Sequence, residues 1–320
     1  MSRITTPFDA TSTADDVLRG LDLHGLRVVV TGGASGIGAA TTEALVRAGA
    51  SVVVAARNTE QGERAADRLR AAAPGGEVEV RPLDLADPAS VHAFTAAWTG
   101  PVDVVVANAG VMATPETRTA DGWELQFATN HLGHHALVTG LRDALLAGAA
   151  ERGRPSRVVV VSSAGHHTAG VDLDDLMFTR RPYDPWVAYG QSKTANALFA
   201  VEATRRWRSE GIVANAVHPG GILTDLSRHL SPEQAVAIGI AHEDGSPAGG
   251  FKSPQQGAAT SVLLAASPLV EGVGGRYFED CAEAVPATDD APLVGVRPWA
   301  LDPDTAQRLW DVSEGLLGAR

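Results

Sequence analysis

Short apolar runs alternate with longer helical stretches along most of the chain. Each run is rich in Val and Ala and is short enough for a strand that is buried on both faces. The runs lie at Arg27–Thr31, Ser51–Ala56, Glu77–Leu83, Val102–Ala107, Arg157–Ser163, Ile212–Val217 and Gly275–Glu279. The stretches between them are rich in Ala, Leu, Glu and Arg, with Gly or Pro at their borders. They cover Ile37–Ala48, Glu60–Ala73, Ala89–Thr99, Asp121–Ala149, Val187–Glu210 and Pro254–Ala266, and Asp302–Leu317 predicts a last helix.

This alternation predicts an α/β protein, a single-domain Rossmann fold with a doubly wound parallel sheet of about seven strands flanked by helices. No repeat or low-complexity linker divides residues 25–320, so we expect one domain there. Residues 1–24 form an N-terminal extension, in which overlapping Ser/Thr-x-x-Asp patterns at Ser12 and Thr13 predict a short helix. Residues 164–185 and 224–253 form unusually long loops, which we expect to bind substrate.

Composition and charge exclude several classes of protein. Of the 320 residues, 44% are hydrophobic and 20% are charged, which is typical of a globular chain. The net charge of −12 and the absence of a Lys/Arg run argue against a nucleic-acid partner. The single cysteine, Cys281, fits a reducing compartment, and no segment is long and apolar enough to span a bilayer. We therefore expect a cytoplasmic protein without a membrane span.

A glycine-rich turn follows the first predicted strand and leads directly into a helix. Its sequence is Thr31-Gly32-Gly33-Ala34-Ser35-Gly36-Ile37-Gly38. Small residues let the backbone approach a pyrophosphate, and the helix directs its free N–H groups and positive dipole end at the anion. Glycines also form ordinary tight turns, but a strand before the turn and a helix after it favour dinucleotide binding.

The end of the second predicted strand, Ala55-Ala56-Arg57-Asn58, bears on the choice of cofactor. NAD-binding folds usually place a carboxylate here for the adenosine ribose. Arg57 can instead pair with a 2′-phosphate, so NADP(H) is favoured over NAD(H), with an exposed surface arginine as the competing interpretation. Asp84-Leu85 would border the adenine, and Asn108-Ala109-Gly110 supplies another turn that the cofactor can approach closely.

Tyr189 and Lys193 begin a predicted helix and are four residues apart, so they lie on one helical face. A neighbouring ammonium stabilises phenolate and is expected to lower the pKa of Tyr189 towards the range of general acid–base catalysis. Taken alone, a Tyr-x-x-x-Lys pair often occurs on helices by chance.

With the glycine turn, this pair resembles the short-chain dehydrogenase/reductase family from Leu26 to Glu283. Thr31–Gly38 is similar to the family's Thr-Gly-x-x-x-Gly-x-Gly, and Asn108–Gly110 is similar to its Asn-Ala-Gly turn. The residues that resemble its catalytic tetrad are Asn130, Ser163, Tyr189 and Lys193. The segments Asn130–His134 and Ser162–His167 resemble the retinol-dehydrogenase and WW-domain-oxidoreductase branch, which tends to use NADP(H) and includes enzymes for lipophilic alcohols and ketones.

The resemblance implies an NADP(H)-dependent enzyme that interconverts a ketone or aldehyde and an alcohol. Tyr189 would move the proton, and Ser163 would hydrogen-bond the same substrate oxygen. Lys193 would hold the nicotinamide ribose beside Tyr189, and Asn130 would anchor a water that links the lysine to solvent. Residues of a segment similar to the family's Pro-Gly segment would hold the carboxamide end of the cofactor, although a simple turn is the alternative; they are Pro219, Gly220, Ile222 and Thr224.

The choice between Ser162 and Ser163 rests on the resemblance, because adjacent strand residues point to opposite faces. The second serine of such a pair usually has the catalytic role in the family, so we predict Ser163. The interval from Ser163 to Tyr189 is 26 residues, about twice the family's spacing, owing to an inserted loop at Gly165–Pro185.

Other features of the sequence suggest alternatives to this interpretation. No cysteine or paired carboxylate accompanies the clustered histidines, so we predict no metal site, and His166 or His167 could instead line the substrate pocket. No Gly-x-Ser-x-Gly elbow supports a hydrolase. Trp186 and Phe251 are candidates for an apolar substrate wall.

The runner-up function is a non-catalytic NADP(H)-binding regulatory protein. Family relatives often form homodimers or homotetramers through the helices that contain the Asn130 and Tyr189 equivalents.

Overall fold

A single eight-stranded sheet forms the centre of the molecule in the computed structural model, which describes residues 3–73, 75–224, 226, 232–237, 242, 248–291 and 293–318. The strand order is β3-β2-β1-β4-β5-β6-β7-β8. The strands are β1 (Arg27–Thr31), β2 (Ser51–Ala56), β3 (Glu77–Pro82), β4 (Val104–Ala107), β5 (Ser156–Val161), β6 (Ile212–His218), β7 (Tyr277–Glu279) and β8 (Ala282–Glu283). Neighbouring strands are parallel except that β8 is antiparallel to β7. The predicted α/β fold is confirmed.

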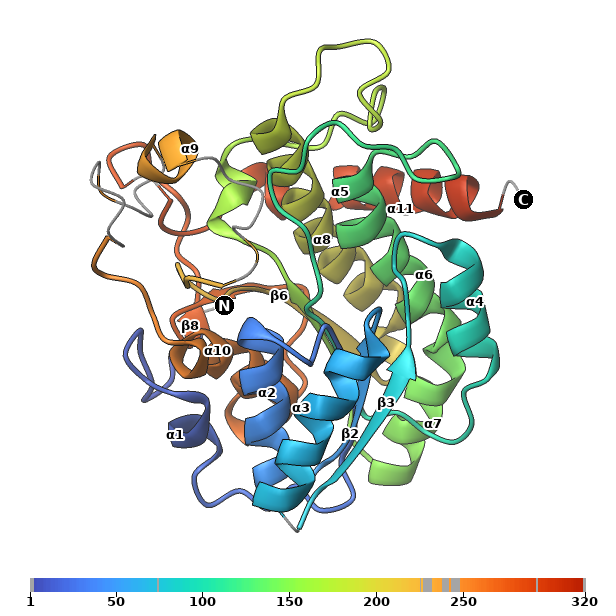
Figure 1. Ribbon diagram of the computed structural model, residues 1–320, viewed down its shortest axis with the longest axis vertical. Coiled ribbons are helices and arrows are strands. Elements are labelled where there is room, and N and C mark those ends of the chain that lie inside the picture. Colours follow the sequence, from blue (N-terminus) through green and yellow to red (C-terminus); the bar gives the residue numbers. More distant parts are fainter. Residues whose placement is uncertain are drawn as a thin grey trace.

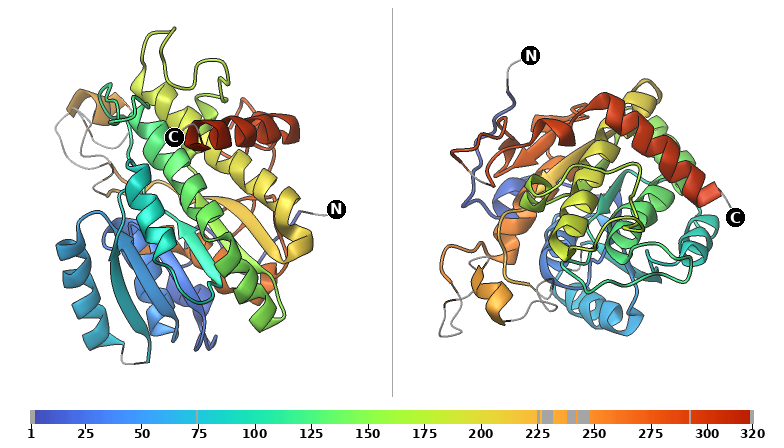
Figure 2. Two further views of the ribbon diagram at one scale, coloured as in Figure 1. Left: turned by 90° about the vertical axis from the view of Figure 1, so that its right-hand side faces the viewer. Right: turned by 90° about the horizontal axis from the view of Figure 1, so that it is seen from above.

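Helices cover both faces of this sheet (Figures 1 and 2). One face packs against α1 (Ala14–Leu18), α2 (Gly36–Arg47), α3 (Thr59–Ala72) and α10 (Pro254–Ala266). The other packs against α4 (Pro88–Ala96), α6 (Gly133–Gly140), α7 (Arg142–Arg152) and α8 (Pro185–Trp207). Successive strand residues alternate between the two cores, so that Val28 and Val30 face one and Val29 the other. Because β1 to β7 are parallel, their carboxyl ends lie at the same edge of the sheet, where open α/β sheets bind ligands.

The predicted helix Asp121–Ala149 is wrong as one continuous element. Its first turn is α5 (Leu125–Phe127), capped by the Glu124 carboxylate, which accepts from the Gln126 and Phe127 N–H groups. A π-helical turn, η1 (Ala128–Leu132), follows before α6 and α7. Such turns are rare and often mark functional sites, and the apolar periodicity of the sequence does not reveal them. The structure also adds β8, which is too short for a pattern of hydrophobic residues to predict.

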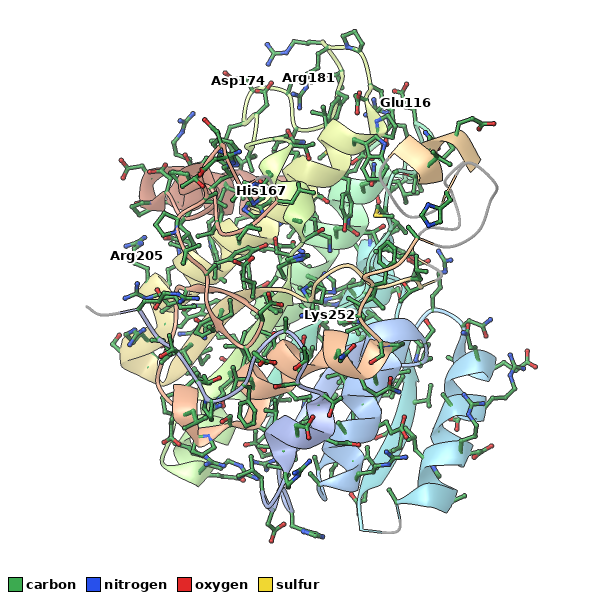
Figure 3. The ribbon with its side chains drawn as sticks, turned by 90° about the vertical axis from the view of Figure 1, so that its left-hand side faces the viewer. Glu116, His167, Asp174, Arg181, Arg205 and Lys252 are labelled. Atoms are coloured by element: carbon green, nitrogen blue, oxygen red, sulfur yellow. The ribbon has the colours of Figure 1, made fainter. Side chains whose placement is uncertain are left out.

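The inserted loop after β5 has its own internal structure. It begins with a 3₁₀ turn, η2 (Ala164–His167), and then projects from the top of the molecule (Figure 1), with Asp174 and Arg181 on this projection (Figure 3). Burial raises the pKa of Asp175, but hydrogen bonds from Thr179, Arg180 and Arg181 outweigh it and lower that pKa to about 2. Half of the second predicted loop, 224–253, lies outside the described residues, and α9 (Pro232–Ala237) is its one described helix.

The C-terminal helix α11 (Pro303–Gly318) lies across α8 (Figure 2). Trp310 of α11 stacks on Phe199 of α8, with 5.4 Å between ring centroids and 9° between planes. Trp207 meets the same indole edge-on at 5.2 Å. In the described structure, residues 188–200 and 202–204 of α8 are buried, so this helix has almost no free face in a single chain.

We expect Trp310→Ala to lower the free energy of unfolding by about 3 kcal/mol, because it leaves a cavity between α8 and α11. Trp299 is a matched control, since its side chain is 39% exposed and Trp299→Ala is expected to cost about 1 kcal/mol. Urea unfolding followed by circular dichroism measures both. Equal losses for the two variants would contradict the role of Trp310 as the anchor of α11.

Candidate active site

The glycine-rich turn after β1 has the shape of an anion cradle. Gly32 has φ +65°, in the left-handed region, and a Cβ placed on Gly38 would lie 2.3 Å from the Gly32 carbonyl oxygen. Ser35 occupies the N-cap position of α2, yet its side chain makes no capping hydrogen bond with the described residues. The caps of α3, α4, α8 and α10, in contrast, all accept from their helices. The first N–H groups of α2, from Gly36 and Ile37 onward, can therefore meet a phosphate.

Thr31 joins this turn to the one that follows β4. Its Oγ1 accepts from the N–H groups of Asn108 and Ala109, both at 2.9 Å. The Asn108 side chain returns a hydrogen bond to the Thr31 carbonyl oxygen, also at 2.9 Å. The structure thus brings together two of the predicted cofactor-binding segments.

The predicted adenosine-binding residues lie along neighbouring strand ends. Arg57 is exposed just beyond β2 and forms no ion pair with any described residue, and Asn58 caps α3 by accepting from the Gln61 N–H at 3.0 Å. Asp84 follows β3 and accepts from the Ala86 N–H at 2.9 Å, while Leu85 is buried. Because the strand order is β3-β2-β1, the segments after β2 and β3 lie on the same side of β1. These positions fit the adenosine half of a dinucleotide.

Tyr189, Ser163 and Lys193 form a cluster where β5 meets α8. A Cβ placed on Gly165 would lie 2.6 Å from the Tyr189 ring and 3.5 Å from the Ser163 Oγ, so these two side chains are neighbours. The Lys193 Nζ lies 5.7 Å from the centroid of the Tyr189 ring. Lys193 donates from Nζ to the Val161 carbonyl oxygen at 3.0 Å. The doubled interval between Ser163 and Tyr189 does not separate them, because the intervening loop projects away from the sheet edge.

The two serines at the end of β5 have different partners. Ser162 is buried, and its Oγ donates to the Lys193 carbonyl oxygen of α8 at 2.7 Å. Ser163 is half-buried, and its Oγ accepts from the Gly165 N–H at 3.0 Å. The structure therefore brings Ser163, and not Ser162, next to the Tyr189 side chain.

Asn130 lies in the π-helical turn η1 and is fully buried. Its side chain accepts from the Val111 N–H at 2.8 Å and donates to the Ser192 Oγ at 2.9 Å. A Cβ placed on Gly110 would lie 3.0 Å from the Asn130 Oδ1 and 3.5 Å from the Lys193 Nζ. All four residues of the predicted tetrad consequently converge on one region.

Electrostatics of the buried pair correct one expectation. Burial raises the pKa of Tyr189 to about 12, and the Ser163 hydrogen bond opposes this only in part. Burial also lowers the pKa of Lys193 to about 8. The predicted lowering of the Tyr189 pKa by Lys193 is therefore wrong for this state of the protein, because the loss of water disfavours both charged forms. The phenol is protonated at neutral pH, as a proton donor must be.

The segment after β6 closes the edge of the site. Pro219 is buried, and Gly220, with φ +100°, lies beneath the aliphatic stem of Lys252. Lys252 in turn forms an ion pair with Asp280 (Figure 3 labels Lys252). A Cβ placed on Gly36 of the glycine-rich turn would lie 3.3 Å from the Thr224 side chain, and one placed on Gly257 of α10 would lie 2.8 Å from Ile222. The structure thus brings the predicted Pro-Gly segment to the glycine-rich turn.

Each of the five clustered histidines has a hydrogen-bond partner in the chain; they are His131, His134, His135, His166 and His167. His131 contacts Ser313, and His135 contacts Glu314, both on α11. His166 is fully buried and accepts from the Arg297 N–H at 3.2 Å, while His167 contacts the Gly295 carbonyl oxygen at 3.0 Å (Figure 3). The first two contacts join η1 and α6 to α11, and the last two join η2 to residues 295–297.

Two residues that the sequence pattern did not indicate connect the segments around the catalytic residues by hydrogen bonds. Gln191 is buried within the Tyr189–Lys193 segment, accepts from Arg181 at 2.8 Å and donates to the Leu176 carbonyl oxygen at 2.9 Å. It ties the inserted loop to α8. His218 accepts from the Ala164 N–H at 3.1 Å and so links the ends of β5 and β6. No local pattern marks these residues, because their partners are distant in the sequence.

Comparison with known proteins identifies the family. Residues 27–235 match the model of the short chain dehydrogenase family. The chain belongs to the short-chain dehydrogenase/reductase family. This short-chain dehydrogenase is 54% identical to "Probable oxidoreductase" of Streptomyces antibioticus over 93% of this chain and 100% of that protein. It is therefore an oxidoreductase of this family.

The predicted branch of the family is also confirmed. The chain is 38% identical to retinol dehydrogenase 14 of Homo sapiens, over 92% of this chain and 87% of the human protein. A Pseudomonas aeruginosa RhlG/NADP active-site complex has a TM-score of 0.62 and 25% identity, over 81% of this chain and 95% of that one. No helix in the described parts of the short-chain dehydrogenase is both long and apolar enough to cross a membrane.

Proposed function

We propose that this short-chain dehydrogenase is an NADP(H)-dependent enzyme that interconverts a ketone or aldehyde and an alcohol, with Tyr189 as the general acid and base. The observation that carries the proposal is the proximity of Ser163, Tyr189 and Lys193 at the sheet edge that also holds the glycine-rich turn. A bound nicotinamide would supply the hydride in reduction and accept it in oxidation.

The proton is handled by the protein's own side chains. The Ser163 Oγ accepts from the Gly165 N–H, so its hydroxyl proton is available to the Tyr189 oxygen or to a substrate oxygen. Tyr189, whose pKa burial raises to about 12, then gives its phenol proton to the carbonyl oxygen as that oxygen gains charge. Ser163 stabilises the developing charge by hydrogen bonding. The reverse reaction returns the proton from the alcohol to Tyr189.

Residues at the sheet edge would hold the cofactor. The N–H groups at the start of α2 suit the pyrophosphate, and Lys193 suits the nicotinamide ribose. Pro219, Gly220, Ile222 and Thr224 would border the carboxamide end. Arg57 carries the preference for NADP(H), because its guanidinium is exposed beside the turn, where a 2′-phosphate would lie, and no carboxylate competes at this strand end.

The substrate is proposed to be lipophilic. Trp186 lies beside Tyr189, with ring centroids 6.4 Å apart at 87°, and Phe251 borders Gly221 after β6. Trp186 offers apolar surface beside the phenol, and Phe251 offers it at the segment after β6. The likeness to retinol dehydrogenase 14 agrees with such a substrate.

Association through α6 and α8 would require α11 to move, since α11 covers α8 in the single chain. A homodimer or homotetramer of this protein would therefore use a surface other than the one its relatives often use. A cytoplasmic location stays a prediction from the single cysteine.

Steady-state assays of purified protein test the proposed function. Oxidation of NADPH and of NADH is followed at the nicotinamide absorbance with aliphatic and aromatic aldehydes and ketones. We expect turnover with NADPH and a higher kcat/KM for the more apolar carbonyl compounds. Binding of NADPH without turnover of any carbonyl or alcohol would instead favour the regulatory alternative.

Arg57→Ala is expected to lower kcat/KM for NADPH by about 10- to 100-fold, because it removes a charge-assisted contact to the 2′-phosphate. The value for NADH should change less than about twofold. Arg68→Ala, on the exposed side of α3, is the matched control and should change neither value. Equal losses for both cofactors in Arg57→Ala would contradict the assignment of Arg57.

A further inference from the structure

His134 connects the cofactor turn to the catalytic asparagine through one buried imidazole. Its Nδ1 lies 2.9 Å from the Asn130 carbonyl oxygen in the π-helical turn η1. Its Nε2 lies 2.8 Å from the Thr31 Oγ1 at the end of β1. The side chain is 2% exposed, so solvent does not compete for either contact. No other described histidine reaches both a tetrad residue and the glycine-rich turn.

We propose that His134 is a positioning residue that holds the Thr31 turn for cofactor binding and the Asn130 backbone for proton transfer. This inference rests on the proposed function, since it assigns His134 a part in the same site. In the described structure, the His134 ring hydrogen-bonds Thr31 and Asn130, so it acts on the site through these two residues.

The hydrogen bonds define a single tautomer. The Asn130 carbonyl oxygen can only accept, so the His134 Nδ1 carries the proton. Thr31 Oγ1 already accepts from two backbone N–H groups, so its own proton goes to an acceptor. The unprotonated Nε2 at 2.8 Å is closer than the Val106 carbonyl oxygen at 3.4 Å. Burial lowers the pKa of His134 to about 4, which agrees with a neutral ring that does not change its charge near pH 7. The imidazole is thus a fixed spacer with a donor at one end and an acceptor at the other.

Each end of the ring controls a different part of the site. The Thr31 hydroxyl fixes the N–H groups of Asn108 and Ala109, and through them the distance between the turns after β1 and β4. The Asn130 carbonyl belongs to a π-helical turn, where regular helical hydrogen bonding is interrupted, so a side-chain donor stabilises the turn. That turn sets the position of the Asn130 side chain near Lys193.

Two substitutions separate these contacts. His134→Asn places an amide N–H near the former Nδ1 and keeps the donor to Asn130, but it loses the acceptor for Thr31. His134→Gln places an amide oxygen near the former Nε2 and keeps the acceptor for Thr31, but it loses the donor to Asn130. His135→Asn and His135→Gln are the matched controls, because His135 faces Glu314 and Trp310 of α11 instead of the cofactor turn.

The expected result is a division of effects between the two variants. His134→Asn should raise the dissociation constant of NADPH, measured by fluorescence titration, about tenfold, with kcat within about threefold of the wild-type value. His134→Gln should bind NADPH nearly as well as the wild type, with kcat about tenfold lower. Nitrogen NMR, with the His134 signal assigned by its loss in His134→Asn, should show that the wild-type His134 imidazole stays neutral and Nδ1-protonated from about pH 5 to pH 9.

Other outcomes would overturn the proposal. Equal changes of NADPH affinity and kcat in both His134 variants, matched by equal losses of thermal stability, would leave His134 as a general packing residue. Changes as large in the His135 controls would do the same. Absence of turnover in the wild type would contradict the proposed function instead, and the NADPH titrations and the NMR tautomer would still decide whether His134 holds the turn.

Discussion

Tyr189→Phe is expected to lower kcat by about 10²- to 10⁴-fold, because it removes the proton donor while leaving the ring in place. The aromatic ring remains buried at the start of α8, so the fold should be retained. Affinity for NADPH should change less than about threefold, since the phenol makes little difference to the cradle at the start of α2. Steady-state kinetics and a fluorescence titration of the same preparation measure the two effects.

Tyr183→Phe is the matched control. Its hydroxyl also forms buried hydrogen bonds, donating to the Thr114 carbonyl oxygen and accepting from Gln126, each at 2.9 Å. It lies outside the Tyr189 cluster, so kcat should stay within about threefold of the wild-type value. A Tyr189→Phe variant that keeps wild-type turnover would contradict the assigned mechanism.

Ser163→Ala is expected to lower kcat by about 10²-fold, because the substrate oxygen loses a hydrogen-bond donor as it gains charge. Ser162→Ala is a sharp control, because it removes a neighbouring hydroxyl of the same strand that faces α8. Its main effect should be a loss of about 1 kcal/mol in the free energy of unfolding, from the lost hydrogen bond to the Lys193 carbonyl oxygen. Kinetics with a fixed carbonyl substrate, together with urea unfolding of both variants, separate the two roles.

The opposite pattern would reassign the serine. If Ser162→Ala lowered kcat and Ser163→Ala left it unchanged, the polar group at the substrate oxygen would be Ser162. The hydrogen bonds of the two serines make this outcome unexpected, since Ser162 Oγ is committed to α8 and Ser163 Oγ lies at Tyr189.

Much of the sheet could be predicted because its strands are buried on both faces. The β1, β2 and α10 limits agree with the sequence pattern, since apolar runs there end at Gly, Asn or Pro. The break between α5 and α6 could not be predicted, because it depends on Glu124 capping and on a π-helical turn within an apolar, Ala-rich stretch. The two-residue β8 is stabilised by pairing with β7 and by the N-terminal segment at Ile4, which no local pattern reveals.

The site shows the same division. The spacing of the motifs and the family resemblance predicted the residues around Tyr189. The structure brings these residues together from β1, β4, β5 and α8. The direction of the Tyr189 pKa was wrong, because the spacing of Tyr189 and Lys193 says nothing about how completely both groups are removed from water. The sequence pattern also gives no sign of the proposed role of His134, because its partner Thr31 lies 103 positions away along the chain.

The most direct test of the account is a single-turnover reaction with NADPH deuterated on the transferred position of its nicotinamide ring. The alcohol product is analysed by mass spectrometry, with wild-type protein and Tyr189→Phe run side by side. We expect one deuterium on the carbinol carbon in the wild type and a rate about 10²- to 10⁴-fold lower in the variant. NADPH that binds but transfers no deuterium to any carbonyl compound, or transfer at equal rates in both proteins, would contradict it.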